Sequence, residues 1–241
     1  MFQAFNSIQG GKTMSYEHER YTSREKNTAF NTVWPAVECG ETADNELRHY
    51  LRSRRLDFET AYLAGWYPSV INNCLRLVIP CKSLNPKHAY YQARALDKSI
   101  RLRYVSPSGP RLGALCIVDP VLFDWDDTLS PSVTAIVEGP MCALALASLG
   151  IPAIALMGIS PEPSACSHLV SILKSRHHDA AILLDNEDEA QASASNLAVF
   201  LAGNGIINHV FLLKSKDVAD SSDKERKKIA GDILQWQRKS R

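Results

Sequence analysis

Acidic side chains stand at the ends of two apolar, strand-like segments in the C-terminal half of this 241-residue chain. The segment "TAIV" is followed by Glu138 and Gly139. The segment "AAILL" is followed by an acidic run that contains Asp185, Glu187 and Asp188. In a parallel sheet the carboxyl ends of the strands meet at one edge, which is where such sheets carry their chemistry. Carboxylates gathered there repel each other unless a cation joins them, so the pattern predicts a site for Mg²⁺ or Mn²⁺ that handles phosphoryl groups.

The acidic run at 185–189 also has a simpler interpretation. Short acidic side chains cap helices well, and a helical pattern begins at Glu189. A second carboxylate at a strand end, that of Glu138, favours the metal site over the cap, because ligands for one ion must cluster.

Short apolar strands alternate with helices after about residue 130, which is typical of a parallel sheet covered on both faces. Strands are expected at 133–137, 153–157, 180–185 and 209–213, with helices at 141–149, 165–173 and 189–201. An amphipathic helix is expected at 222–236, and its narrow apolar side should either pack on this sheet or dock a partner.

The first half of the chain follows a different pattern. Helices are expected from Thr42 and over 58–64, followed by short strands at 74–80, 89–96, 101–106 and 114–118. Pro and Gly separate several of these strands, as in a small and mostly antiparallel layer. The expected fold is therefore α/β, with a flexible tail (1–40), an α+β subdomain with mostly antiparallel strands (41–118), a linker (119–132), a parallel-sheet α/β subdomain (133–220) and a C-terminal amphipathic helix (221–241).

The composition is that of an ordinary globular protein, with 45% hydrophobic residues and a net charge of +1. A net charge near zero does not by itself indicate a nucleic-acid partner. The stretches 46–55 and 94–111 are nevertheless locally basic and can bind phosphates. No C-x-x-C pair is present, which argues against a zinc ribbon. No signal peptide and no apolar run of membrane-spanning length is visible, so a cytoplasmic protein without membrane contact is expected.

The stretch "VEGPMCALALASLGIPAIALMG", followed by "AILLDNEDEA", resembles a TOPRIM domain. TOPRIM is the Mg²⁺-binding fold shared by bacterial and phage-type primases, topoisomerases and some nucleases. The resemblance implies that Glu138 and Gly139 are the family's Glu-Gly pair, that Gly158 is its later turn glycine, and that Asp185 is its first aspartate.

Two positions depart from the TOPRIM pattern. The second aspartate falls on Glu187, or on Asp188 if one residue is inserted. Cys142 stands where the family often has an aspartate. These departures leave room for a non-catalytic TOPRIM protein that binds nucleic acid.

The upstream half resembles the catalytic core of bacterial or phage-type, DnaG-like DNA primases. The segments "YLRSRRLDFETAYLAGWYP", "RLVIPC", "YYQARALD" and "LRYVSPSGPR" match that core's motifs in order, and "KSKDVAD" resembles a segment after its last TOPRIM strand. The resemblance implies a nucleotidyltransferase that makes short primers on single-stranded DNA from nucleoside triphosphates, with Glu138, Asp185 and Glu187 as catalytic residues. It places nucleotide and template binding on basic and aromatic residues: Arg76, Arg94, Arg103, Tyr104 and Arg111. For Arg76 a solvent-facing strand position is an equal alternative, because its neighbours alternate with it.

Primases of this type usually carry a zinc domain, and some carry a helicase motor. No cysteine pattern or P-loop here supplies either. A separate zinc-binding module or a replicative helicase is therefore an expected partner, and the compact size favours a phage or mobile-element origin.

A rival motif is "VLFDWDDTLS" (121–130), which resembles the opening of haloacid-dehalogenase-type phosphohydrolases. There Asp124 would be the nucleophile and Asp126 the general acid/base. Pro120 precedes a short apolar run, which suits a central strand poorly, and this interpretation leaves the upstream half unexplained. The two hypotheses differ in which carboxylate lies beside Asp185: Asp124 for the phosphohydrolase, Glu138 for the primase.

Overall fold

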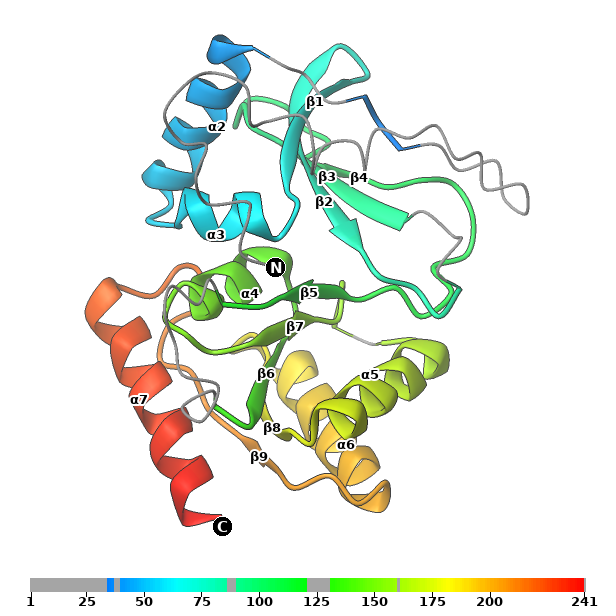
Figure 1. Ribbon diagram of the computed structural model, residues 1–241, viewed down its shortest axis with the longest axis vertical. Coiled ribbons are helices and arrows are strands. Elements are labelled where there is room, and N and C mark those ends of the chain that lie inside the picture. Colours follow the sequence, from blue (N-terminus) through cyan, green and yellow to red (C-terminus); the bar gives the residue numbers. More distant parts are fainter. Residues whose placement is uncertain (1–33, 37–39, 86–89, 121–130, 160, 241) are drawn as a thin grey trace, which may run out of the picture.

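The chain forms two β-sheets with helices around them, stacked one above the other in Figure 1. The computed structural model describes residues 34–36, 40–85, 90–120, 131–159 and 161–240. The expected tail (1–40), apart from 34–36 and Gly40, and the core of the expected linker, 121–130, lie outside the described residues.

The first layer is a four-stranded antiparallel sheet in the order β1-β2-β3-β4. Its elements are α2 (Glu41–Ser53), α3 (Phe58–Leu63), β1 (Tyr67–Ile71), β2 (Cys74–Cys81), β3 (Tyr90–Ala95) and β4 (Tyr104–Val105). The side chain of Asp57 caps α3 by accepting a hydrogen bond from the Thr60 amide at 2.6 Å. The sequence did not predict β1, which contains Pro68. This strand lies at the sheet edge, where the missing amide hydrogen of a proline is tolerated.

The second layer is a five-stranded sheet in the order β5-β7-β6-β8-β9, in which only β5 runs antiparallel to its neighbour. Its strands are β5 (Cys116–Val118), β6 (Val133–Val137), β7 (Ala153–Ala155), β8 (Asp179–Leu183) and β9 (Asn208–Val210). Its helices are α4 (Pro140–Ala147), α5 (Pro163–Arg176), α6 (Asp188–Gly203) and α7 (Asp223–Lys239). Helices α5 and α6 pack on one face of this sheet, and α4 and α7 pack on the other. The expected α/β fold is confirmed.

Strand β5 corrects one boundary of the sequence-based division. Residues 114–118 were expected in the antiparallel layer, yet Cys116 to Val118 pair with β7 of the second sheet. A three-residue apolar strand carries no information on which sheet completes it, because its partner is chosen by tertiary packing.

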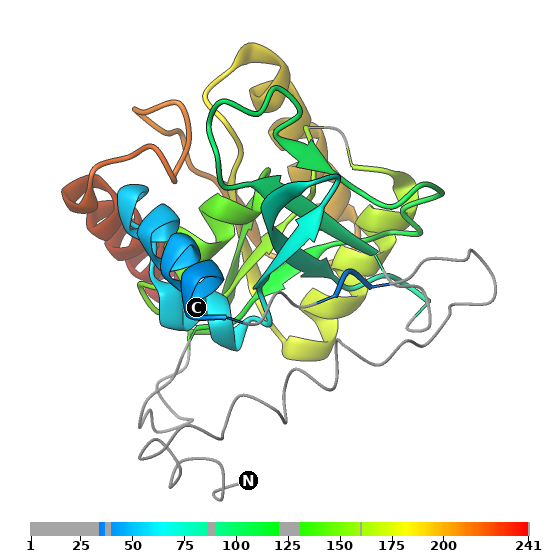
Figure 2. The same cartoon turned by 90° about the horizontal axis from the view of Figure 1, so that it is seen from above.

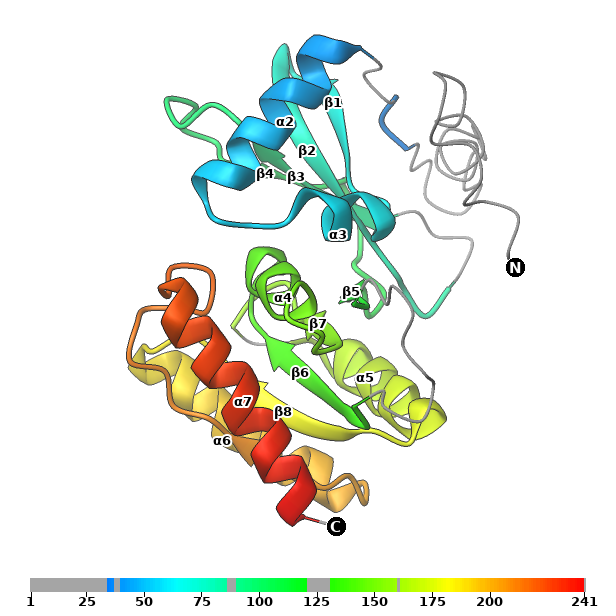
Figure 3. The same ribbon diagram turned by 60° about the vertical axis from the view of Figure 1, so that its left-hand side comes forward.

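Helix α4 joins the two layers. All of its residues are buried, and it lies between α3 above and β6 below (Figure 3). A helix that is apolar all round must be covered on every side, which suits a position between layers. The resulting hydrophobic core is continuous from Leu47 and Leu51 of α2, through α4, to Ile233 of α7.

Helix α7 packs against the protein's own core, which is the first of its two expected roles. Ile233 is fully buried, and α7 contacts both α4 and β6. Its first turn is fixed by a capping box between Ser222 and Glu225. Helices α2 and α7 lie on the same side of the molecule (Figure 2). Among the described helices, none combines the length and apolar character that a membrane crossing requires.

Candidate active site

Two predicted acids meet at the carboxyl ends of neighbouring parallel strands. Strands β6 and β8 pair in parallel, with Val137 opposite Leu183 where they end. Glu138 follows β6 directly, and Asp185 follows β8 by two residues. The structure thus brings Glu138 and Asp185 to one edge of the sheet.

A third carboxylate, that of Asp217, enters from the loop that follows β9. One oxygen of Asp185, one oxygen of Asp217 and the sulfur of Cys142 all lie within 4.8 Å of one another. Asp217 was not among the predicted site residues, although it belongs to the primase-like segment "KSKDVAD". The acidic residue in that segment was the feature of the sequence that could have pointed to Asp217 as a site residue.

Burial and mutual repulsion disfavour the ionised forms of Glu138 and Asp185. The pKa of Glu138 is raised to about 7, chiefly by burial and then by the charges of Asp185, Glu187 and Asp217. The pKa of Asp185 is raised to about 6, again by burial first and then by Asp217 and Glu187. Lys216 opposes both shifts. Closely spaced carboxylates in a partly desolvated site behave in this way.

The residues present fit a divalent metal ion. Oε2 of Glu138 is buried and has no hydrogen-bond partner among the described residues, so its lone pairs are available to bind an ion. Hard oxygen ligands of like charge are what Mg²⁺ or Mn²⁺ requires, and such an ion would relieve their repulsion. Burial raises the pKa of the neighbouring Cys142 thiol well above its usual value, so this side chain adds no further negative charge.

The two alternatives for the second acidic position differ in their surroundings. Glu187 lies at the N-cap of α6 without a capping side-chain bond, and it forms an ion pair with Lys216 (Oε1 to Nζ, 3.1 Å). Its charge also contributes to the raised pKa of Glu138 and of Asp185. Asp188 lies in the first turn of α6 and is exposed, as Glu187 is, but it is not among the main causes of either raised pKa. The structure therefore associates Glu187, rather than Asp188, with the site.

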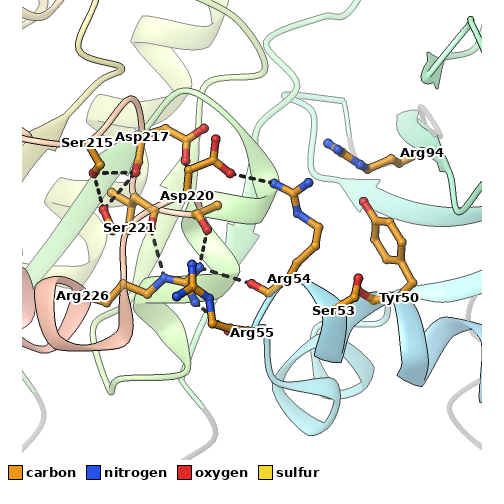
Figure 4. Close-up of polar contacts among 12 residues, drawn as sticks. Tyr50, Ser53, Arg54, Arg55, Arg94, Ser215, Asp217, Asp220, Ser221 and Arg226 are labelled. Carbon is orange, nitrogen blue, oxygen red and sulfur yellow. Dashed lines mark hydrogen bonds and ion pairs between the residues drawn. The ribbon is translucent and has the colours of Figure 1, made fainter. Parts of the chain in front are cut away.

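A pocket of about 280 Å³ lies at this site, and the first layer forms its opposite wall. Its wall residues there are Arg54, Gln92, Arg94 and Tyr104. The Arg94 guanidinium donates a hydrogen bond to the Tyr104 hydroxyl and lies 5.9 Å from the ring centroid of Tyr50. Arg54 donates to Oδ1 of Asp220 at 3.3 Å, across the two halves of the chain (Figure 4). Cations on one wall thus face carboxylates on the other.

The remaining predicted arginines occupy three different environments. Arg76 is 2% exposed, and its guanidinium donates to backbone carbonyls, including those of Ile71 at 3.3 Å and Leu102 at 3.1 Å. The solvent-facing alternative for Arg76 is therefore wrong. Arg103 is exposed beside β4. Arg111 is exposed, and its Nη1 donates to the carbonyl of Met157, a pocket residue, at 3.1 Å.

Both predicted glycines line the pocket. Gly139 is the N-cap of α4 with an extended backbone (φ −114°). Gly158 has a backbone φ of +152°, a conformation that residues other than glycine rarely adopt.

The rival acids Asp124 and Asp126 lie outside the described residues. Within the described part of the chain, the carboxylates that interact with Asp185 are those of Glu138, Glu187, Asp217 and Asp220. Glu138 interacts with Asp185, as the primase hypothesis expects, whereas the structure does not describe where Asp124 lies.

The fold and pocket define a mixed α/β protein with a metal-competent acidic site at the carboxyl edge of a parallel sheet. No protein-family model matches the sequence, and no curated protein matches it either. Solved structures do match. The DnaG primase catalytic domain bound to ssDNA is similar at 16% identity and TM-score 0.60, over 91% of this chain and 80% of that one.

Two further primase structures match over most of both chains. The primase fragment of the bacteriophage T7 primase-helicase protein is 16% identical with TM-score 0.56, over 77% of this chain and 73% of that one. The RNA polymerase domain of Mycobacterium tuberculosis primase DnaG is 14% identical with TM-score 0.55, over 80% of this chain and 76% of that one. The chain therefore has the fold of DnaG-type primase catalytic domains, as the sequence resemblance implied.

Proposed function

We propose that this chain is a primase-like nucleotidyltransferase, which joins nucleotides into short primers on single-stranded DNA. The observation that carries the proposal is the pocket itself: the acids Glu138, Asp185 and Asp217 stand on one wall, and Arg54 and Arg94 on the other. A primase must hold triphosphates and a template strand in one place, and both are dense in negative charge. Cations and metal-binding acids facing each other suit that task.

In this proposal Glu138, Asp185 and Asp217 hold Mg²⁺ or Mn²⁺, and Glu187 tunes their charge. The bound ion would neutralise the reacting phosphates and orient them for in-line transfer. Because Lys216 pairs with Glu187, the acidic rim carries its own cation, which can exchange that partner for a phosphate oxygen.

The first layer supplies nucleotide and template contacts. Arg94 reaches the pocket directly, while Arg103 and Arg111 extend a basic surface from the β3–β4 region toward Met157. Tyr104, held by Arg94, offers a ring for base stacking. Arg76 serves this surface indirectly, because it binds the carbonyls of Leu102 and Arg103 and so holds the backbone that carries Arg103 and Tyr104.

The expected partners of this activity are a single-stranded DNA template and nucleoside triphosphates. A zinc-binding module or a replicative helicase on another chain would supply start-site selection or loading. The alternatives are a phosphohydrolase that uses Asp124 and a non-catalytic nucleic-acid-binding protein.

The test is incubation of the purified protein with single-stranded DNA, labelled nucleoside triphosphates and Mg²⁺ or Mn²⁺, with p-nitrophenyl phosphate in a parallel reaction. Oligonucleotide products from the wild type, absent from Glu138→Gln, would support the proposal. Glu189→Gln is the matched control, since Glu189 is an exposed acid in the first turn of α6 outside the pocket. Phosphate release that depends on Asp124 would favour the phosphohydrolase. DNA binding without either product would favour the non-catalytic protein.

A further inference from the structure

Helix α7 carries a buried cation whose hydrogen bonds go to backbone. Arg226 is 4% exposed, and Figure 4 shows the dashed contacts of its guanidinium with the neighbouring segments. Nη1 donates to the Arg55 carbonyl at 2.6 Å, and Nε donates to the Val218 carbonyl at 3.1 Å. Nη2 donates to the carbonyls of Arg54 (3.3 Å) and Ala219. Among the described residues, none of its side-chain hydrogen bonds ends on a carboxylate.

Burying the charged guanidinium of Arg226 costs free energy. We take the retention of this charge as a sign that the position of the two loops matters. A buried charge is tolerated only when its donors are satisfied, and burial lowers the pKa of Arg226. The planar guanidinium can bind several carbonyls at fixed angles, which the single ammonium of lysine cannot do.

The two segments that Arg226 joins both reach the candidate active site. One is the turn at Arg54 and Arg55, and the Arg54 side chain lines the pocket. The other is the 217–221 loop, which begins with the pocket carboxylate of Asp217. The side chain of Arg54 also donates to Asp220 of this loop, so the two segments are joined twice.

The 217–221 loop also lies beside α4. Asp217 and Ala219 line the pocket together with Cys142, and the Cys142 sulfur lies within 4.8 Å of a carboxylate oxygen of Asp217. Arg226 binds the carbonyls of both Val218 and Ala219. The peptide unit that joins Ala219 to Asp220 is held at both ends, because its amide donates to Oδ1 of Asp217 at 2.7 Å.

The Asp217 side chain is oriented by the same loop. The backbone carbonyl of Asp217 accepts hydrogen bonds from the hydroxyls of Ser215 and Ser221, each at 3.0 Å. Its Oδ1 accepts from the Asp220 amide at 2.7 Å. The carboxylate therefore has little freedom once the loop backbone is fixed.

We propose that Arg226 is a positioning residue for the metal site: it fixes the 217–221 loop so that a carboxylate oxygen of Asp217 stays beside Asp185. This inference rests on the metal site of the proposed function. Among the described residues, Arg226 makes no hydrogen bond or ion pair with the acids of the metal cluster, although its charge interacts with that of Asp217. It acts through the carbonyls of Val218 and Ala219. Through Arg226, α7 would then contribute to the geometry of the pocket, although no residue of α7 is among those that line it.

The experiment measures Mn²⁺ affinity by electron paramagnetic resonance of the free ion and thermal stability in the absence of metal. Arg226→Met keeps a long side chain but removes the planar guanidinium group and its hydrogen-bond donors. Groups that orient metal ligands typically contribute about tenfold or more to affinity, so Arg226→Met should lose about tenfold in Mn²⁺ affinity. Ile233→Ala, a fully buried residue two turns further along α7, is the control for destabilisation alone. It should lower the melting temperature while leaving Mn²⁺ affinity at the wild-type value.

Wild-type Mn²⁺ affinity in folded Arg226→Met would overturn the inference, and so would equal losses of affinity in Arg226→Met and Ile233→Ala. Arg226→Lys covers the case in which Arg226→Met does not fold. It keeps the charge but not the geometry, so its affinity should also fall, and wild-type affinity in Arg226→Lys would overturn the inference. If the wild type itself bound no Mn²⁺, the metal site would fail and the inference with it. If it bound Mn²⁺ but made no primers, only the proposed function would fail.

Discussion

Lys216 places its ammonium group 3.1 Å from the carboxylate of Glu187, at the rim of the acidic pocket. The same lysine lowers the pKa of Glu138 and of Asp185, against the effects of burial and of the other acids. The pocket therefore carries a built-in counter-charge that keeps its ligands closer to ionisation. Two consequences of this balance can be measured.

Lys216→Met should move the pH dependence of Mn²⁺ binding to higher pH. Protons compete with metal for carboxylates, and without the lysine the pKa values of Glu138 and Asp185 rise further. Mn²⁺ titrations across the range from about pH 5 to about pH 9 would show the shift. Lys214→Met, at an exposed lysine in the same loop, should leave the midpoint unchanged. An unshifted midpoint in Lys216→Met would show that the lysine is not coupled to the ligands.

Glu138→Gln should abolish metal-dependent activity and yet stabilise the metal-free protein at alkaline pH. The folded-state pKa of Glu138, about 7, lies above its unfolded value of 4.5, so the folded state binds more protons between these limits. Its contribution to stability therefore falls as pH rises through this window, and glutamine removes the penalty. Melting temperatures at about pH 5 and about pH 8 without divalent ions should converge in the variant. A Gln variant that remains active, or that is equally destabilised at both pH values, would contradict the assignment.

Arg94→Ala, Arg103→Ala and Arg111→Ala should each weaken single-stranded DNA binding. Each lost phosphate contact should flatten the salt dependence by about 0.7 in log–log slope. Fluorescence anisotropy at several salt concentrations measures both quantities. Arg238→Ala, at an exposed arginine in the last turn of α7, and Glu138→Gln should keep the wild-type slope. Unchanged slopes in all three arginine variants would remove the first layer as the template platform.

Ile233→Ala should destabilise the whole protein by about 2–5 kcal/mol, because the side chain is fully buried between α7 and the rest of the core. Urea unfolding would measure the loss. Gln235→Ala, on the exposed side of the same helix, should change stability little. A near-zero effect of Ile233→Ala would mean that α7 is held mainly by its polar contacts.

Local pattern was sufficient to predict the alternation of strands and helices after residue 130 and the positions of Glu138 and Asp185 at strand ends. Hydrophobic periodicity is a short-range signal, and parallel pairing brings the carboxyl ends of neighbouring strands to one edge whatever the rest of the chain does. The same reasoning failed for β1 and β5. An edge strand with a proline and a three-residue strand carry too little pattern to show which neighbours they pair with.

The remaining features depend on contacts between distant segments. Arg76 alternates with its neighbours like a surface residue, and it is buried because carbonyls from two other segments meet it. Asp217 lies in a polar loop, and only folding brings it within 4.8 Å of a ligand atom of Asp185. Arg226 looks like one more charge on an amphipathic helix until α7 packs on the core and the carbonyls at 54–55 and 218–219 converge on it. Sequence alone therefore determined which strand ends carry acid, because that depends on local periodicity. Tertiary structure decided which loops complete the site, because long-range packing sets the distance between residues far apart in the chain.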